Sequence, residues 1–171
     1  MSPTRGKATD RITIERVYPA TLEDVWALWT AREGIESWWG PDGFAVTVRA
    51  LDLRPGGELR YAMTAVAPET VKFMKAQGMP VTTELRLRYT EVTPHRRLAW
   101  LHVADFIPGV APYDIGSAVE LSRVDGGVRL VLTLDRMHDD VWTQRAVMGW
   151  ESELGKLGKA LAARSAAEAR P

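Results

Sequence analysis

Six short runs of alternating apolar and polar residues follow one another in the middle of the chain, and one long run with helical spacing comes after them. The six runs are separated by turn signals, of which Asp125-Gly126-Gly127 is the clearest, and they cover 44–53, 59–63, 84–92, 98–103, 115–124 and 128–134. A period of two is typical of strands that bury one face, and a tight turn between two such runs makes an antiparallel hairpin. The pattern therefore predicts an antiparallel meander.

The segments on either side of the meander predict its covering elements. Residues 11–18 alternate and end at Pro19, which indicates a further strand. Thr21 is a suitable N-cap for a helix over 21–31, and a second short helix is expected over 33–38. The last helix begins at Asp139 or Asp140, runs to about Ala163 and carries an apolar stripe of Val147, Trp150, Leu154, Leu157 and Leu161. The expected fold is α+β with the order β-α-α-β6-α, in which a curved antiparallel sheet wraps around the long C-terminal helix.

Length and composition predict one domain. The chain has 171 residues, of which 46% are hydrophobic, and this suffices for one core of ordinary size. We expect a single domain over 11–163, a disordered N-terminal tail over 1–10 and a frayed C-terminal tail over 164–171.

The charge balance and the absence of cysteine exclude several classes of function. Lys and Arg number 22 and so do Asp and Glu, so no net positive field attracts nucleic acid or an acidic membrane. With no cysteine there are no disulfides or thiolate ligands, which fits a reducing compartment. No segment is apolar and long enough for a membrane span. A cytoplasmic protein is expected.

Several short motifs occur in an order that resembles a known family. They are Pro19-Ala20 through Trp29-Thr30, Trp38-Trp39-Gly40-Pro41, Asp52-Leu53-Arg54-Pro55-Gly56-Gly57, Glu91-Val92-Thr93-Pro94 and Gly149-Trp150. In this order they resemble the heat-shock-protein-90 ATPase activator homologue family over about 11–162. The resemblance implies the START-like, birch-pollen-allergen-like SRPBCC superfamily, with its helix-grip fold, but it supplies no shared catalytic residues.

Residues 67–82 replace what is a short turn in that family. Pro68 suits the first helical position, while Gly78 and Pro80 suit its end, so the segment predicts an inserted helix.

The long connections predict where a ligand pocket opens. Alternate turns of a meander lie at alternate ends, so the connections 67–82, 105–114 and 135–139 share one end. Two of them are long and apolar, which is typical of functional loops. We expect a lid of Val71, Phe73 and Met74 over a pocket lined by Tyr61, Met63, Leu85, Trp100, His102, Phe106, Tyr113, Met137, Val141 and Trp142.

Three functions remain open from the sequence. The first is a binding protein for a small apolar or aromatic molecule. The second is an enzyme of cyclase, aromatase or hydratase type in the same cavity, with His102, Tyr113 and Glu84 as its acid, base or phenol groups. The third is a partner of a chaperone ATPase. No metal site is expected because the three histidines lack metal spacing, and no cofactor motif is present. The protein is expected to be a monomer, or a homodimer paired through the apolar run 98–103.

Overall fold

The computed structural model describes residues 11–105 and 107–169 of the chain. Its elements follow the expected order, with one inserted helix. They are β1 (Arg11–Tyr18), α1 (Leu22–Thr30), α2 (Arg32–Glu36), β2 (Phe44–Leu51), β3 (Glu58–Ala65), α3 (Pro68–Ala76), β4 (Thr82–Thr93), β5 (Arg97–Ala104), β6 (Tyr113–Val124), β7 (Gly127–Asp135) and α4 (Asp140–Glu168).

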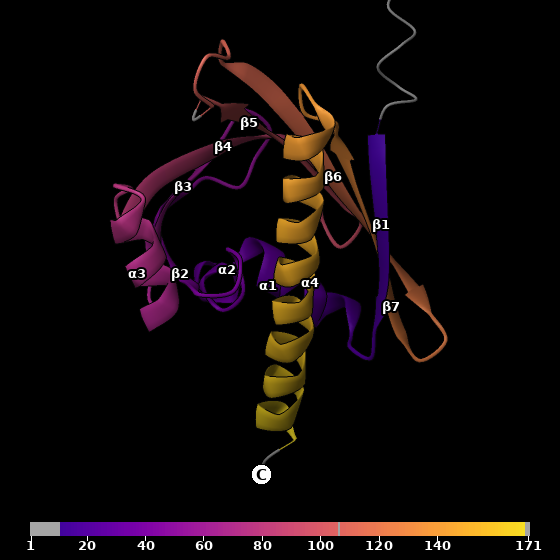
Figure 1. The fold of residues 1–171 in the computed structure, drawn as a ribbon. Helices are drawn as coiled ribbons and strands as arrows, with labels where there is room; N and C mark the ends of the chain where they lie inside the picture. The colour runs from indigo at the N-terminus through magenta and orange to yellow at the C-terminus, as the bar shows by residue number, and fades with distance from the viewer. Residues whose placement is uncertain (1–10, 106, 170–171) are drawn as a thin grey trace, which may run out of the picture.

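The seven strands form one antiparallel sheet in the order β1-β7-β6-β5-β4-β3-β2. The first strand therefore joins the sheet beside the last, and the other six form the meander. The sheet curves around α4, which runs across its open side (Figure 1). Register shifts between Val48 and Ala50 and between Tyr89 and Glu91 add to this curvature. The predicted α+β helix-grip fold is confirmed.

The C-terminal half of α4 packs against the concave face of the sheet and forms the hydrophobic core there. Its residues Leu154, Leu157 and Leu161 are buried, as are Val25 and Leu28 of α1. The Tyr18 hydroxyl donates a buried hydrogen bond of 2.8 Å to the Leu154 carbonyl and so fixes α4 to β1. The predicted N-cap of α1 is present, because Thr21 accepts from the Asp24 N–H, and Asp139 caps α4 by accepting from the Trp142 N–H.

The inserted helix lies outside this core. α3 begins at Pro68 as expected, and Gly78 adopts the positive φ of 68° that ends a helix. None of its residues is buried. It stands at the β2–β3 side of the sheet, away from α4 (Figure 1).

Two details differ from the sequence expectations. α4 continues to Glu168, five residues past Ala163, and Arg164 forms a 2.8 Å ion pair with Asp24 of α1. The run 98–103 is no free edge, because β5 pairs with β4 on one side and β6 on the other. The expected dimer through 98–103 is therefore wrong; both of its backbone edges are already hydrogen-bonded. The expected tail 1–10 lies outside the described residues.

No helix within residues 11–105 or 107–169 combines the length and the apolar character needed to cross a membrane.

Candidate functional site

A cavity of about 330 Å³ lies between the N-terminal half of α4 and the sheet. The residues that line it come from the loop before β2, from four strands, from the β7–α4 connection and from α4. They are Trp39, Gly40, Pro41, Tyr61, Met63, His102, Ile115, Ser117, Leu134, Asp135, Met137, Trp142, Arg145, Ala146, Gly149, Trp150 and Glu153. The volume is that of a site for a small organic molecule.

Indole rings form the deep wall of this cavity. Trp39 meets Trp150 edge to face with ring centroids 5.5 Å apart, and Trp39 meets Tyr61 in the same way at 6.3 Å. Trp100 lies beneath them, 6.0 Å from Trp150, and is itself buried. Such edge-to-face packing holds the rings in fixed positions, so the deep wall is rigid.

Glu153 places a carboxyl group in this apolar wall. It lies on the inward face of α4, three residues after Trp150. Its Oε1 accepts a hydrogen bond of 2.7 Å from the backbone N–H of Gly40. Burial raises the pKa of Glu153 to about 7, although the Gly40 N–H and the Lys156 charge act in the opposite direction. The group therefore exchanges a proton near neutral pH.

Lys156 holds the loop that carries Gly40. Its Nζ donates to the carbonyl oxygens of Gly40 at 2.9 Å and of Phe44 at 3.3 Å. Gly40 has a φ of 90°, which favours glycine, and a Cβ there would lie 3.2 Å from Val46. The α4 side chains Glu153 and Lys156 thus bind the donor and the acceptor of the same residue.

Three further polar groups face the cavity from the strands. Burial raises the pKa of Tyr61 to about 12, so its phenol stays protonated. Burial lowers the pKa of His102, so its imidazole is neutral at neutral pH. The buried Ser117 Oγ has no hydrogen-bond partner among the described residues. These groups provide donors and acceptors inside an otherwise apolar space.

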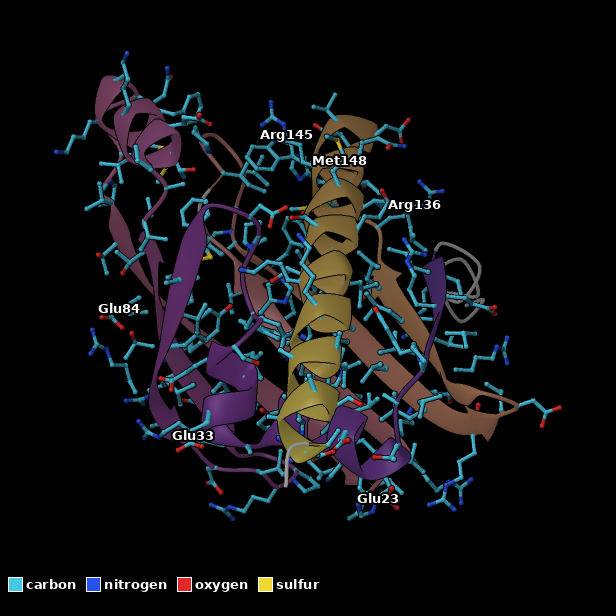
Figure 2. All side chains as sticks on the ribbon, turned by 90° about the horizontal axis from the view of Figure 1, so that it is seen from below. Glu23, Glu33, Glu84, Arg136, Arg145 and Met148 are labelled. Atoms are coloured by element: carbon cyan, nitrogen blue, oxygen red, sulfur yellow. The ribbon has the colours of Figure 1, made fainter. Side chains whose placement is uncertain are left out.

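The β7–α4 connection and the first turns of α4 form the outer end of the cavity. The Arg145 guanidinium stacks 4.8 Å from the centre of the Trp142 ring. In Figure 2 this arginine extends from α4 toward the side of the molecule where α3 lies. Asp135 accepts from the Gly116 N–H at 2.9 Å and pairs with Arg11 at 3.2 Å. The charged groups at this end are thus mostly engaged with protein partners.

The structure brings five of the expected pocket residues together in the cavity wall: Tyr61, Met63, His102, Met137 and Trp142. The strand residues among them share the inner face of the sheet because they fall on the same parity of the register. Leu87, for example, pairs with His102, which pairs with Ile115.

Four other expected pocket residues lie elsewhere. Leu85 is half-buried near the start of β4, where it pairs with Tyr61 but does not line the cavity, and Trp100 lies in the core behind the rings. Tyr113 packs with Ile107 and Ile115, and its hydroxyl accepts a hydrogen bond from the His138 N–H at 3.1 Å. Val141 is 59% exposed on the outer side of the first turn of α4. Phe106 lies outside the described residues.

The expected lid and one expected acid lie away from the cavity. Phe73 is 58% exposed, and neither it nor Val71 nor Met74 lines the cavity. Glu84 points outward from the sheet (Figure 2) and forms an ion pair with Arg49 at 3.2 Å. Its register partner Ala62 is on the outer face, whereas Tyr61 is on the inner one. His102, Tyr113 and Glu84 are therefore not gathered around one point.

Twelve of the seventeen lining residues were not expected from the sequence, and the most informative of them is Glu153. A signal was present, because a carboxylate stands three residues after Trp150 and four before Leu157, on the apolar stripe itself. A charged residue on a buried stripe indicates a functional or paired group. Among the described residues no cluster of His, Asp and Glu side chains has the arrangement of a metal site.

A curved antiparallel sheet, a C-terminal helix across it and an apolar cavity between them define the class of helix-grip proteins. Residues 19–162 match the family model described as "Activator of Hsp90 ATPase homolog 1-like protein". The chain belongs to this family, and through it to the SRPBCC superfamily.

Solved structures with the same fold come from several bacteria. A protein from Chromobacterium violaceum is 22% identical, with a TM-score of 0.71 over 90% of this chain and 97% of that one. A protein from Mycobacterium smegmatis is 21% identical, with a TM-score of 0.70 over 96% and 98%. An AHSA1-like protein from Aeromonas hydrophila is 20% identical, with a TM-score of 0.68 over 91% and 94%. None of the curated proteins compared with this sequence matches it.

Proposed function

We propose that this protein binds a small apolar or aromatic molecule in the cavity beneath the N-terminal half of α4. The observation that carries the proposal is the cavity itself, about 330 Å³ in volume and walled mainly by Trp39, Trp150, Met63, Ile115 and Leu134. Apolar sites with a few polar groups that converge on the interior are typical of ligand pockets. Here Tyr61, His102 and Glu153 supply those polar groups.

The form of α4 supports the same function. Leu154, Leu157 and Leu161 in its C-terminal half fill the space against the sheet, whereas Ala146 and Gly149 in its N-terminal half have side chains too small to do so. Apolar space that is left unfilled costs stability, so a ligand that fills it stabilises the folded state.

A filling variant tests the proposal with a neutral fluorescent probe, N-phenyl-1-naphthylamine. We expect the wild-type protein to bind the dye with increased emission and a higher melting temperature. Ala146→Trp, which fills the cavity, should abolish both effects. Met148→Trp introduces the same side chain on the exposed side of the same helix, 67% exposed in the wild type, and should bind normally. Gly149→Leu provides a second filling variant should Ala146→Trp fail to fold. Equal binding by the wild type and the folded filling variants would contradict the proposal.

Proton-transfer catalysis is the second candidate function. It is favoured by the burial that raises the pKa of Glu153 to about 7, which suits a general acid or base at neutral pH. A base of this kind would remove a proton from carbon beside a carbonyl group and return it from solvent. The test is exchange of the α-hydrogens of 2-indanone into D₂O, followed by NMR. Catalysed exchange that Glu153→Gln removes would support this candidate, and exchange at the uncatalysed rate would refute it.

Stimulation of a chaperone ATPase is the third hypothesis, and it rests on the family description alone. An ATPase assay with a purified chaperone tests it, and a rate unchanged by this protein would exclude it.

A further inference from the structure

The charges that line the cavity are unevenly distributed. Two carboxyl groups face the cavity, those of Glu153 and Asp135. Among the described lining residues, Arg145 at the outer end carries the permanent positive charge. The Arg145 guanidinium is stacked on Trp142. His102 stays uncharged because burial lowers its pKa. An anionic group placed at the inner end would therefore meet a carboxyl group and no free cation.

The nearest cation to Glu153 is already engaged. Lys156 directs its Nζ to the carbonyl oxygens of Gly40 and Phe44, with a longer contact to Pro41 at 3.5 Å. Burial also lowers the pKa of Lys156. The Lys156 Nζ is thus bonded to the loop. No ion pair between Lys156 and Glu153 is present among the described side chains.

The protein donates a hydrogen bond to one of the two oxygen atoms of the Glu153 carboxyl group. Oε1 accepts from the Gly40 N–H, and Oε2 accepts no hydrogen bond from any described residue. The Ser117 hydroxyl in the opposite wall is also without a partner within the described chain. A buried hydroxyl without a partner costs free energy, and a ligand group that bonds to Ser117 recovers it.

Aromatic rings line the cavity that this carboxyl group faces. Trp39, Tyr61, Trp142 and Trp150 all line the cavity. The faces of such rings carry negative electrostatic potential and attract ammonium groups, most strongly where water is excluded. A cavity that combines a carboxylate with aromatic rings has the chemistry that recognises an organic cation.

We propose that the cavity is selective for a molecule with an apolar or aromatic body and a protonated amine, and that the amine binds the Glu153 carboxylate. This inference rests on the proposed function and names the chemical class of the ligand.

Three indoles of nearly equal size and shape test the charge preference by isothermal titration calorimetry: tryptamine as the cation, 3-propylindole as the neutral analogue and indole-3-propionate as the anion. We expect tryptamine to bind at least about tenfold more tightly than 3-propylindole, and indole-3-propionate to bind most weakly. Glu153→Gln should abolish the preference, so that tryptamine binds this variant no more tightly than 3-propylindole does. Glu151→Gln removes an exposed carboxylate two residues away on the same helix and should behave as the wild type.

The pH dependence provides a second readout. An ammonium group stabilises the charged form of Glu153, so the affinity for tryptamine should rise as the pH increases from 6 to 8. The other titratable or charged groups facing Glu153 across the cavity and loop are Tyr61, His102, Asp135, Arg145, Lys156 and Asp42. In Glu153→Gln the rise should disappear.

The outcomes separate this inference from the proposed function. Equal affinities for the three indoles, or tightest binding of the anion, would overturn the amine preference and leave the binding function standing. If none of the indoles and no neutral dye binds, the proposed function fails as well.

Discussion

The Glu153 carboxylate accepts a 2.7 Å hydrogen bond from the Gly40 N–H and so joins the middle of α4 to the loop before β2. The two residues are separated by 113 positions in the sequence. Lys156, one turn further along α4, binds the Gly40 carbonyl oxygen. One turn of α4 therefore holds one side of the cavity, because Glu153 and Lys156 form hydrogen bonds with the N–H and the carbonyl oxygen of Gly40.

The stability of the protein should fall as the pH rises, because of Glu153. Burial raises its pKa from 4.5 to about 7, so the folded state binds the proton more tightly than the unfolded state. The stabilisation is complete below pH 4.5 and is lost as the pH rises through about 7, a difference on the order of 3 kcal/mol. Glu153→Gln cannot titrate and should be more stable than the wild type at pH 8. Urea denaturation followed by tryptophan fluorescence at several pH values measures this, and parallel profiles for the two proteins would contradict it.

Lys156→Met should raise the pKa of Glu153 above its wild-type value. The Lys156 charge favours the ionised carboxyl group and so lowers the pKa of Glu153. Without that charge, the increase in pKa caused by burial is larger. The variant also loses the hydrogen bonds to Gly40 and Phe44, which should lower stability by about 1–3 kcal/mol. NMR titration of ¹³C-labelled glutamate side chains measures the pKa. Lys159→Met removes an exposed cation from the same helix and should change neither quantity; a shift of equal size in both variants would show that the effect is non-specific.

Gly34→Ala should destabilise the protein, whereas Gly155→Ala should stabilise it. A Cβ on Gly34 would lie 2.3 Å from the Ala27 carbonyl oxygen and 2.7 Å from the Leu28 Cα, so α1 and α2 would have to separate. Overpacking of this kind costs about 1–3 kcal/mol. Gly155 is exposed on α4 with no atom within 4 Å of an added Cβ, and alanine there should gain about 0.5–1 kcal/mol. Thermal unfolding of the two variants gives the signs, and a stable Gly34→Ala protein would refute the close approach of the two helices.

Leu157→Ala should lower the free energy of unfolding by about 2–5 kcal/mol, because Leu157 is fully buried under α4. Met148→Ala truncates a side chain on the outward face of the same helix (Figure 2) and should change stability by less than about 0.5 kcal/mol. Chemical denaturation of both variants measures the contrast. Losses of similar size would mean that α4 buries a different face.

The order of elements could be predicted from the sequence because it depends on local signals. The Thr21 N-cap, the start of α4 at Asp139 or Asp140, the turn at Asp125-Gly126-Gly127 and the Pro68 and Gly78 boundaries of α3 all have their physical effect within a few residues. Tyr61, Met63 and His102 were expected in the cavity because they lie near the end of the sheet where the long connections gather, and all three line it.

The position of α3 depends on distant contacts instead. Val71 and Met74 have the spacing of a buried stripe, but spacing does not specify a partner surface. The helix lies beside the β2–β3 edge, where Thr70 meets Gly43, and not over the cavity. Glu84 was likewise expected in the cavity; the register of β4 with β3 places it on the outer face.

The sequence by itself determined the strands, the helices, their order and the antiparallel sheet, because side-chain periodicity, caps and turns are properties of neighbouring residues. Only the tertiary structure decided that the N-terminal half of α4 leaves a cavity open and that Glu153 meets Gly40 inside it. Those features depend on how a helix and a curved sheet approach each other, and the residues that meet there lie more than a hundred positions apart.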